Sequence, residues 1–457
     1  MADTIAAVAT AMTASGIGII RISGPESREI AGKIYRSKGG KKRLENVPSH
    51  TIQYGFICDE DEIIDEVLVM VMDAPRSYTG ENTVEIDCHG GVLAMKRVLE
   101  TVIKYGARPA EPGEFTKRAF LNGRIDLSQA EAVIDVINAK NEYALKSSVS
   151  QLRGNIQRVI KEIRQGIIYQ IAYIESALDD PEHISIDGYG DTLKEEISLL
   201  KEKLNGLLNT VREGKLMKEG IKTVIVGKPN AGKSSLLNLL VGEERAIVTD
   251  IAGTTRDILE ETIVLHGISL RMIDTAGIRD TDDVVEKIGV KKAVENAKDA
   301  DLILYVVDSS VPLDENDKEI IELLKDKKAI VILNKMDLQQ QVTEEDLKAK
   351  TNHPVVAVSA KEEEGIENLE AQIKELFFEG DLSFNDEIYI TNMRHKAALE
   401  DAKRSLELVE NSIEMQMPED FFSIDLMNAY EALGSIIGES VGEDLVNEIF
   451  SKFCTGK

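Results

Sequence analysis

Hydrophobic and polar positions alternate in different ways along the chain and divide it into regions of different structure. In the first region, the partly alternating apolar patterns at residues 18–22 and 62–72 predict strands. Residues 91–103 have the period of an amphipathic helix, and closely spaced prolines follow them. We therefore predict a small α/β domain over residues 1–118.

The patterns after this region are helical, and similar patterns return towards the end of the chain. Apolar residues recur at helical spacing over residues 127–138 and 159–178, and again over residues 390–408 and 424–437. Both stretches are therefore predicted to be mainly α-helical.

Between the two helical stretches, short apolar runs alternate with helical patterns, as is typical of a β/α array. Each run is bounded by turn or polar residues, and its continuous hydrophobicity suits a parallel sheet buried on both faces. The five runs are residues 223–226, 270–273, 302–307, 329–333 and 355–358. We predict a domain over residues 218–381, inserted into one helical domain formed by residues 119–217 plus 382–457. The alternative is four consecutive domains, because sequence alone does not show that distant helices pack together.

Length and charge restrict the classes of protein to which the chain can belong. At 457 residues the chain is long enough for about three domains. Its 54 basic and 81 acidic residues give a net charge of −27, which argues against tight non-specific binding to nucleic acid. An RNA partner would need a local basic patch or a second protein. No apolar run approaches the ~20 residues of a membrane span, and no leader-like segment begins the chain, so we expect a cytoplasmic protein without membrane attachment.

The first of the five apolar runs ends in a sequence with the composition of a phosphate-binding loop. Gly227 is followed, after four residues, by Gly232, Lys233 and Ser234, and an apolar helical segment begins at Ser235. Such a loop needs glycines that let backbone amides surround the phosphates, an ammonium for the β and γ oxygens, and a hydroxyl for Mg²⁺. Because it lies between a predicted strand and a predicted helix, we interpret it as a nucleotide site rather than an ordinary turn.

Three further motifs follow later strands of the same domain and indicate the nucleotide. Asp274-Thr-Ala-Gly277 can supply a carboxylate that holds Mg²⁺ through water and an amide for the γ-phosphate. In Asn334-Lys-Met-Asp337, the carboxylate can accept from the ring N–H and the 2-amino group of guanine, a donor pair that adenine lacks. Ser359-Ala-Lys361 follows the next strand, where a backbone amide can meet the guanine carbonyl oxygen. The order of these motifs predicts GTP bound with Mg²⁺.

The residue after Gly277 excludes one common way of orienting water. Ras-like GTPases place a Gln there and use an arginine to stabilise developing charge, whereas this chain has Ile278, which cannot hydrogen-bond. A monovalent cation near the phosphates would do electrostatically what an arginine does, and Asn230 and the segment 249–257 are candidates for holding it. The carboxylates that could act on water are Asp280, Asp282, Asp283 and Glu286.

With these residues in place, the chain resembles the MnmE (TrmE) family of tRNA-modification GTPases over essentially its whole length. Beside the GTPase motifs, the resemblance is carried by short stretches at residues 3–6, 18–24, 77–81, 89–91, 112–120, 126–131, 394–395 and 454–457. Two positions depart from the family pattern. Thr455 stands where an aliphatic residue is usual, which bears on how the tail docks, and residues 11–16 replace a glycine-rich turn beside the folate pocket.

The resemblance implies a fold, a function and a set of partners. The fold is a P-loop GTPase domain with a mainly parallel sheet, inserted in an all-α domain and preceded by a small α/β domain that binds tetrahydrofolate and dimerises. The function is that of a GTPase activated by potassium that installs an aminomethyl-type group at C5 of the wobble uridine of certain tRNAs. The one-carbon unit comes from 5-formyl-tetrahydrofolate or another one-carbon folate. The partners are a second copy of the chain, tRNA, and the FAD-containing protein MnmG in a heterotetramer.

The resemblance also assigns roles to residues that match the family's motifs. It implies Asn230, Thr249, Ile251 and Thr254 as potassium ligands, Ser234 and Thr255 as magnesium ligands, and Glu286 as the residue that orients the hydrolytic water. It implies Arg21, Glu81, Arg124 and Lys457 as folate contacts, and a role in modification for Cys454. The residues predicted to line the GTP site are Asn230, Ala231, Gly232, Lys233, Ser234, Ser235, Thr249, Asp250, Ile251, Ala252, Gly253, Thr254, Thr255, Asp274, Thr275, Ala276, Gly277, Asn334, Lys335, Met336, Asp337, Ser359, Ala360 and Lys361.

A function from a different class is a GTP-dependent ribosome-assembly factor or RNA-binding switch, because such proteins share the GTPase motifs. The folate-like first domain favours the enzyme, since those relatives lack it. The sequence also shows no appended basic RNA-binding module. Binding of 5-formyl-tetrahydrofolate distinguishes the two hypotheses.

Overall fold

The chain divides by its internal contacts into two compact units. The computed structural model describes residues 3–39, 43–185, 188–243, 261–265, 267–273, 300–378, 388–439, 441–453 and 456. Unit 1 is formed by Met1–Ile134, Gln151–Ile197 and Asp401–Lys457, and unit 2 by Asp135–Ser150 and Ser198–Glu400. Each unit has its own sheet and its own hydrophobic core.

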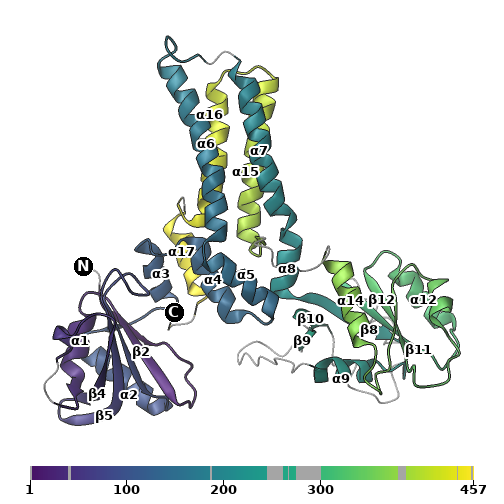
Figure 1. Ribbon diagram of the computed structural model, residues 1–457, viewed down its shortest axis with the longest axis horizontal. Coiled ribbons are helices and arrows are strands. Elements are labelled where there is room, and N and C mark those ends of the chain that lie inside the picture. The colour runs from purple at the N-terminus through teal and green to yellow at the C-terminus, as the bar shows by residue number, and fades with distance from the viewer. Residues whose placement is uncertain are drawn as a thin grey trace. The chain divides into compact units, whose positions relative to one another are not determined.

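Unit 1 begins with a seven-stranded sheet of the order β3-β4-β5-β6-β2-β1-β7 (Figure 1). Its strands are β1 (Ile5–Val8), β2 (Ile17–Ser23), β3 (Tyr35–Ser37), β4 (Thr51–Asp59), β5 (Glu62–Met72), β6 (Thr83–His89) and β7 (Arg108–Pro109). Strands β1 and β7 pair in parallel, and the other described pairs are antiparallel. Helices α1 (Ser27–Ile34) and α2 (Val92–Lys104) pack on one face of the sheet, with the short 3-10 helix η1 (Leu44–Asn46) beside α1. The strands predicted at 18–22 and 62–72 and the helix predicted at 91–103 are confirmed as β2, β5 and α2.

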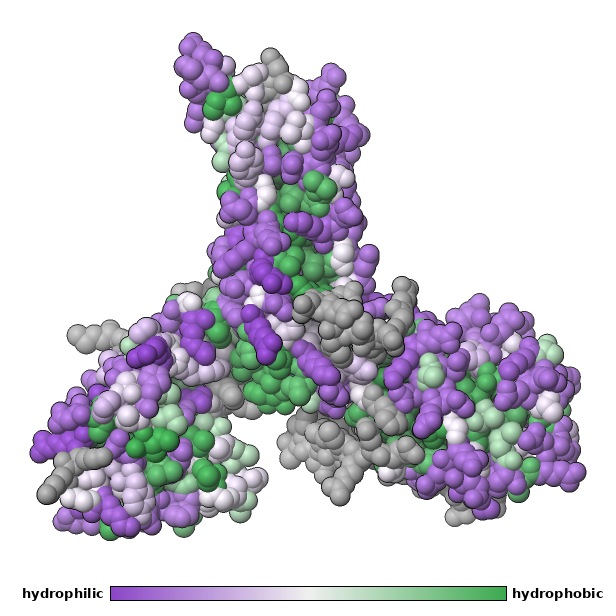
Figure 2. All heavy atoms as spheres, in the orientation of Figure 1, coloured by the Kyte–Doolittle hydropathy of each residue, from purple (hydrophilic) through white to green (hydrophobic). Residues whose placement is uncertain are grey.

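Alternation along the strands of unit 1 decides which side chains the two sheet faces carry. In β2, Ile20 and Ile22 are fully buried in the core with the helices, so that Arg21 between them lies on the opposite face. That opposite face keeps large apolar side chains in contact with solvent: Ile52 is 57% exposed, and Tyr54 and Leu68 are 44% and 43% exposed. Hydrophobic side chains are visible among the polar ones over this part of the chain (Figure 2).

The rest of unit 1 is helical. Helix α6 (Asn155–Asp179) runs beside α16 (Asp420–Ile437), although the two are far apart in sequence (Figure 1). Helix α3 (Glu114–Leu121) contacts α17 (Glu443–Ser451), and buried residues of α4 (Leu127–Asn138) share a core with Phe450 of α17. Helices α4, α5 (Glu142–Leu152), α7 (Tyr189–Asn209) and α15 (Met393–Glu414) contribute residues to both units. The helical predictions on both sides of the middle region are confirmed.

Unit 2 contains a six-stranded sheet of the order β13-β12-β11-β8-β10-β9, which is parallel except for the β9–β10 pair. The strands are β8 (Ile221–Gly227), β9 (Glu261–Leu265), β10 (Ile268–Met272), β11 (Leu302–Asp308), β12 (Ala329–Asn334) and β13 (Val355–Ala357). The helices are α8 (Val211–Glu219), α9 (Lys233–Glu243), α12 (Glu315–Leu324), α13 (Glu344–Lys348) and α14 (Ile366–Phe377). All five predicted apolar runs are strands of this sheet.

Burial on both faces explains the continuous hydrophobicity of these runs. In β8, Ile221 and Ile225 belong to the core with α9 and α14, whereas Val224 and Val226 belong to the core with α12 and α13. The strand pairs in parallel with both β10 and β11, so that its carboxyl end, where the phosphate-binding loop begins, lies in the middle of the sheet. Ligands of parallel α/β sheets bind at this edge.

The predicted fold class is confirmed: a small α/β domain, an all-α part, and a P-loop domain with a mainly parallel sheet inserted between helical segments. The domain boundaries at 118, 217 and 381 stay predictions. Among the described residues, no helix combines the length and the hydrophobicity that crossing a lipid bilayer requires.

Candidate functional site

The loop after β8 has the backbone geometry of a phosphate cradle. Gly227, Asn230 and Gly232 have positive φ angles of 152°, 61° and 97°. A Cβ atom at Gly232 would lie 2.1 Å from Nδ2 of Asn334, and one at Gly227 would lie 2.4 Å from the carbonyl oxygen of Val306. Glycine is therefore required at both positions by close approach as well as by φ. Asn230 is exposed at the tip of the loop, where its amide side chain can turn towards a ligand.

Lys233, the first residue of α9, places its ammonium across this loop. Its Nζ donates to the carbonyl oxygens of Gly227 at 2.9 Å and Lys228 at 2.7 Å. Burial lowers the pKa of Lys233, because the charged form is partly removed from water. The ammonium is thus held beside the backbone amides of the helix start, which is the position from which it can bind phosphate oxygens. Ser234 and Ser235 follow it in the first turn of α9.

The residues predicted to recognise the base lie close together and are tied to the phosphate loop. Asn334 is buried at the end of β12; its Nδ2 donates to the carbonyl oxygen of Ala231 at 2.9 Å, and its Oδ1 accepts from the amide of Ala360 at 3.1 Å. Ser359 donates to Oδ1 of Asp337 at 3.0 Å. The loop after β8, the segment 334–337 and the segment 359–361 are therefore joined at one edge of the sheet, as the motif order predicts.

Two lysines near this site form ion pairs that were not predicted from the sequence. Lys228 of the loop donates to Asp317 at 2.7 Å and to Asp314 at 3.0 Å, and these two aspartates form a capping box at the start of α12. Lys335 pairs with Asp308, the last residue of β11. The spacing Asp314-x-x-Asp317 before a helical run was the signal in the sequence for the two aspartates that pair with Lys228.

Several predicted site residues lie outside the described residues. They are Thr249, Asp250, Ile251, Ala252, Gly253, Thr254, Thr255, Asp274, Thr275, Ala276, Gly277, Glu286, Cys454 and Lys457. Their roles as potassium, magnesium, water, modification and folate residues stay predictions.

A second group of predicted residues meets in unit 1 around one aromatic ring. The guanidinium of Arg21 lies 5.0 Å from the centroid of the Tyr78 ring, and that of Arg124 lies at the same distance from the same ring. Arg21 also pairs with Glu85 across β2 and β6 at 2.7 Å. Tyr78 was not singled out from the sequence, yet it links two of the predicted folate contacts; its place in the Ser-Tyr-Thr-Gly-Glu stretch was the only signal.

The carboxyl-terminal tail reaches this group. Nη1 of Arg21 is 3.4 Å from the carbonyl oxygen of Gly456. A Cβ atom at Gly456 would lie 2.4 Å from the carbonyl oxygen of Val8, so Gly456 lies tightly against the end of β1. Before the tail, Phe450 and Phe453 pack at a ring distance of 5.4 Å, and Phe120 of α3 lies 6.2 Å from Phe450. Aromatic packing therefore holds the end of α17 against α3.

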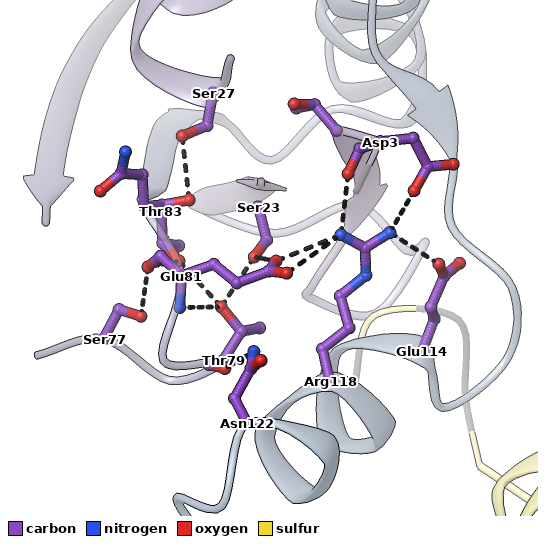
Figure 3. Close-up of polar contacts among 12 residues, drawn as sticks. Asp3, Ser23, Ser27, Ser77, Thr79, Glu81, Thr83, Glu114, Arg118 and Asn122 are labelled. Carbon is purple, nitrogen blue, oxygen red and sulfur yellow. Dashed lines mark hydrogen bonds and ion pairs between the residues drawn. The ribbon is translucent and has the colours of Figure 1, made fainter. Parts of the chain in front are cut away.

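Glu81 stands beside this group on the loop between β5 and β6 (Figure 3). Its Oε2 accepts from Ser23 of β2 at 2.9 Å and from Arg118 of α3 at 3.1 Å. Three of the four predicted folate contacts, Arg21, Glu81 and Arg124, are thus brought into one region of unit 1. Their function as a folate site stays a prediction.

Comparison with known proteins identifies the family. A family model described as the MnmE helical domain matches residues 127–454, and one described as the GTP-binding protein TrmE N-terminus matches residues 4–124. A tRNA modification GTPase MnmE from Lachnoclostridium phytofermentans is 62% identical over 100% of this chain and 99% of its own length. The chain belongs to the MnmE family.

Other members of the MnmE family match over the same extent. The tRNA modification GTPases MnmE of Clostridioides difficile and Acetivibrio thermocellus are 50% and 51% identical, each over 100% of this chain and 99% of its own length. Among solved structures, the G domain of the FeoB iron transporter of T. maritima aligns with 34% of this chain and 98% of its own chain, at 27% identity and a TM-score of 0.27. The assignment rests on the full-length relatives.

Proposed function

We propose that this chain is a potassium-activated GTPase that, with an FAD-containing partner, installs an aminomethyl-type group at C5 of the wobble uridine of certain tRNAs. Membership of the MnmE family makes the chain a GTP hydrolase that acts in tRNA modification. The observation that carries the proposal is the joined phosphate loop and base site of unit 2, in a chain that matches its relatives from end to end.

Recognition of GTP follows from the contacts around Asn334 and Asp337. Asn334 holds the phosphate loop and the segment 359–361 in one geometry, so that the base and the phosphates of one nucleotide can be bound at the same time. The Asp337 carboxylate, oriented by Ser359, accepts from the two N–H groups on one edge of guanine. Lys233 neutralises charge on the phosphate oxygens, which develops further as the γ-phosphate leaves.

The predicted metal ligands have the chemistry that the two ions need. Ser234 and Thr255 offer hydroxyl oxygens of the kind that Mg²⁺ takes beside phosphates. Asn230, Thr249, Ile251 and Thr254 offer neutral amide, hydroxyl and backbone oxygens, which suit a large monovalent cation. Exposure of Asn230 at the tip of the phosphate loop supports this role, because its amide oxygen can approach a cation beside the phosphates. When bound, potassium supplies the positive charge that an arginine provides in other GTPases.

Potassium should accelerate GTP hydrolysis by on the order of 100-fold over sodium at equal ionic strength, as expected for one added electrostatic contact to the transition state. The measurement is phosphate release by purified protein at a concentration that permits dimerisation, in potassium and in sodium chloride. GTP affinity in both salts serves as the control for binding. Equal hydrolysis rates in the two salts would remove potassium activation from the proposal.

The cluster in unit 1 supports a folate site for 5-formyl-tetrahydrofolate or another one-carbon folate. Glu81 can accept from an N–H group of the pterin ring, whose paired N–H groups repeat those of guanine. Arg21, Arg124 and Lys457 can bind the carboxylates of the glutamate tail. Contact of Gly456 with Arg21 supports the place of Lys457, the next residue, in this site. Bound folate would supply the one-carbon unit.

The proposed partners fit the surface of the chain. The uncovered apolar face of the unit 1 sheet, with Ile52, Tyr54 and Leu68, supports homodimerisation through the amino-terminal domain. The net charge of −27 supports the participation of a second protein, the FAD-containing MnmG-type partner in a heterotetramer, in binding tRNA. The proposed location is the cytoplasm.

A further inference from the structure

One buried arginine joins three separate parts of unit 1 beside the proposed folate site. The side chain of Arg118, on α3, is 11% exposed and contacts three carboxylates (Figure 3). Its Nη2 donates to Oδ1 of Asp3 at 2.6 Å and to Oε1 of Glu114 at 3.0 Å. Its Nη1 donates to Oε2 of Glu81 at 3.1 Å and to the carbonyl oxygen of Asp3 at 2.8 Å. The arginine thus links the amino terminus, the loop of Glu81 and its own helix.

Glu81 depends on this arginine for its charge balance. Its side chain is 18% exposed, and Arg118 is its one cationic partner among the described residues. A carboxylate that is largely removed from water is stabilised by a paired cation and by hydrogen-bond donors. Ser23 supplies the other side-chain hydrogen bond, also to Oε2.

The two oxygens of Glu81 are held differently. Oε2 accepts hydrogen bonds from both Ser23 and Arg118. Oε1 makes only a long contact, at 3.4 Å, with Nη1 of Arg118. The backbone of the loop is fixed independently, because Asn122 donates to the carbonyl oxygen of Thr79 at 2.8 Å and Ser77 donates to that of Glu81 at 2.5 Å. The carboxylate is therefore clamped by one oxygen while the other remains able to accept from a ligand.

A neighbouring arginine has the same structural contacts without the contact to Glu81. Arg108 donates to Asp3 at 2.6 Å and to Glu114 at 2.7 Å, and its side chain is 42% exposed. The hydrogen bond from Arg108 holds the pKa of Asp3 at about 2, with Arg118 contributing after it. Loss of either arginine therefore removes an ion-pair partner from both Asp3 and Glu114. Only loss of Arg118 also removes the ion-pair partner of Glu81.

We propose that Arg118 is a positioning residue of the folate site, which orients the Glu81 carboxylate so that Oε1 accepts from an N–H group of the pterin. The proposal rests on the proposed folate function, and Arg118 itself does not contact the ligand in it. The guanidinium fork already pairs with Asp3 and Glu114, so its remaining donor group reaches Glu81 from a fixed position.

The test compares Arg118→Met with Arg108→Met in the full-length protein. Binding of 5-formyl-tetrahydrofolate is measured by calorimetric titration, and the thermal midpoint and GTP affinity are measured for each variant. Arg118→Met should bind the folate about 10- to 100-fold more weakly, as is typical when a residue that orients a ligand-binding group is lost. Arg108→Met should lose thermal stability to a similar extent and keep folate affinity within about twofold. GTP affinity should stay unchanged in both, which reports that unit 2 is folded, and the thermal midpoint reports how far each substitution destabilises the protein.

Two further comparisons keep the proposal testable if Arg118→Met does not fold. Arg118→Lys retains the positive charge but not the forked N–H donors of the guanidinium. It should lose less folate affinity than Arg118→Met, whereas Arg108→Lys should lose none. In a Glu81→Gln background, Arg118→Lys should cause no additional loss, because the arginine acts through the carboxylate.

The outcomes separate this proposal from the folate function itself. Wild-type protein that binds no folate overturns both. Wild-type binding with unchanged affinity in the Arg118 variants overturns the positioning role and leaves the folate site standing. Equal losses in the Arg108 and Arg118 variants, or additive losses with Glu81→Gln, would show a general structural effect and would also overturn it.

Discussion

Replacement of Asp337 by Asn is expected to weaken GTP binding by about 100- to 10,000-fold and to raise the affinity for xanthosine triphosphate. The carboxylate is 14% exposed and accepts a hydrogen bond from Ser359, so in the proposed site it would accept from two N–H groups of guanine without first reorienting. Each hydrogen bond to a charged group contributes about 1.5–3 kcal/mol, and the loss of two corresponds to that range of affinity. An Asn amide can instead donate to the 2-carbonyl oxygen of xanthine.

The measurement is a titration of both nucleotides against the wild type and the variant. Gain of xanthosine triphosphate binding is its own folding control, because an unfolded variant would bind neither nucleotide. Asp346→Asn provides a second control: Asp346 belongs to the exposed capping box of α13, and its loss should leave GTP affinity unchanged. Unchanged GTP affinity in the Asp337 variant would show that the base is recognised elsewhere.

Replacement of Glu286 by Ala is expected to reduce GTP turnover by about 100- to 10,000-fold, the usual contribution of a group that orients or deprotonates a nucleophile. Ile278 cannot hydrogen-bond to water, so another side chain must position it, and the family resemblance assigns that role to Glu286. GTP affinity should be retained, because the phosphate loop and the base site do not include this residue.

Asp283→Ala is the matched control for this experiment. Asp283 belongs to the same run of carboxylates, and its loss removes a similar charge from the same stretch of chain. It should leave turnover close to that of the wild type, measured as single-turnover phosphate release in potassium. Full turnover by the Glu286 variant, or equal losses in both variants, would contradict a specific role for Glu286.

The fold of unit 2 could be predicted from sequence because its strands are buried on both faces. A continuous apolar run such as 302–307 has one structural explanation in a β/α array, and the polar motifs come directly after the runs. Asn334 is an example of a site residue that could be predicted: the sequence places it at the end of β12. Its hydrogen bonds to Ala231 and Ala360 form because the loops that follow the parallel strands of this sheet meet at one edge. The edge strand β9 was not predicted.

Unit 1 was harder to predict because its sheet is antiparallel and half exposed. The strand β6 alternates buried Val84, Ile86 and Cys88 with charged residues, a signal that was present but was not used. Strand β4 carries exposed Ile52 and Tyr54 on the uncovered face, and these hide the alternation.

The contacts that build the unit 1 site could not be predicted because they join distant parts of the chain. Arg118 and Glu81 are 37 residues apart, and Arg21 and Gly456 are 435 residues apart. No local pattern specifies such pairs; they result from the packing of α3 against the loop of Glu81 and of Gly456 against the end of β1. Resemblance to a family supplied Arg21, Glu81 and Arg124, but not Tyr78 or Arg118, which connect them.

Nucleoside analysis of bulk tRNA from cells that lack this protein tests whether the chain is needed for modification of the wobble uridine. Hydrolysed tRNA from the deletion strain and its parent would be compared by liquid chromatography and mass spectrometry, with the wild-type gene and the Glu286→Ala gene restored in parallel. The 5-substituted wobble uridine should disappear in the deletion strain, return with the wild-type gene and remain absent with the Glu286→Ala gene. An unchanged level of the 5-substituted uridine in the deletion strain would contradict the proposed function.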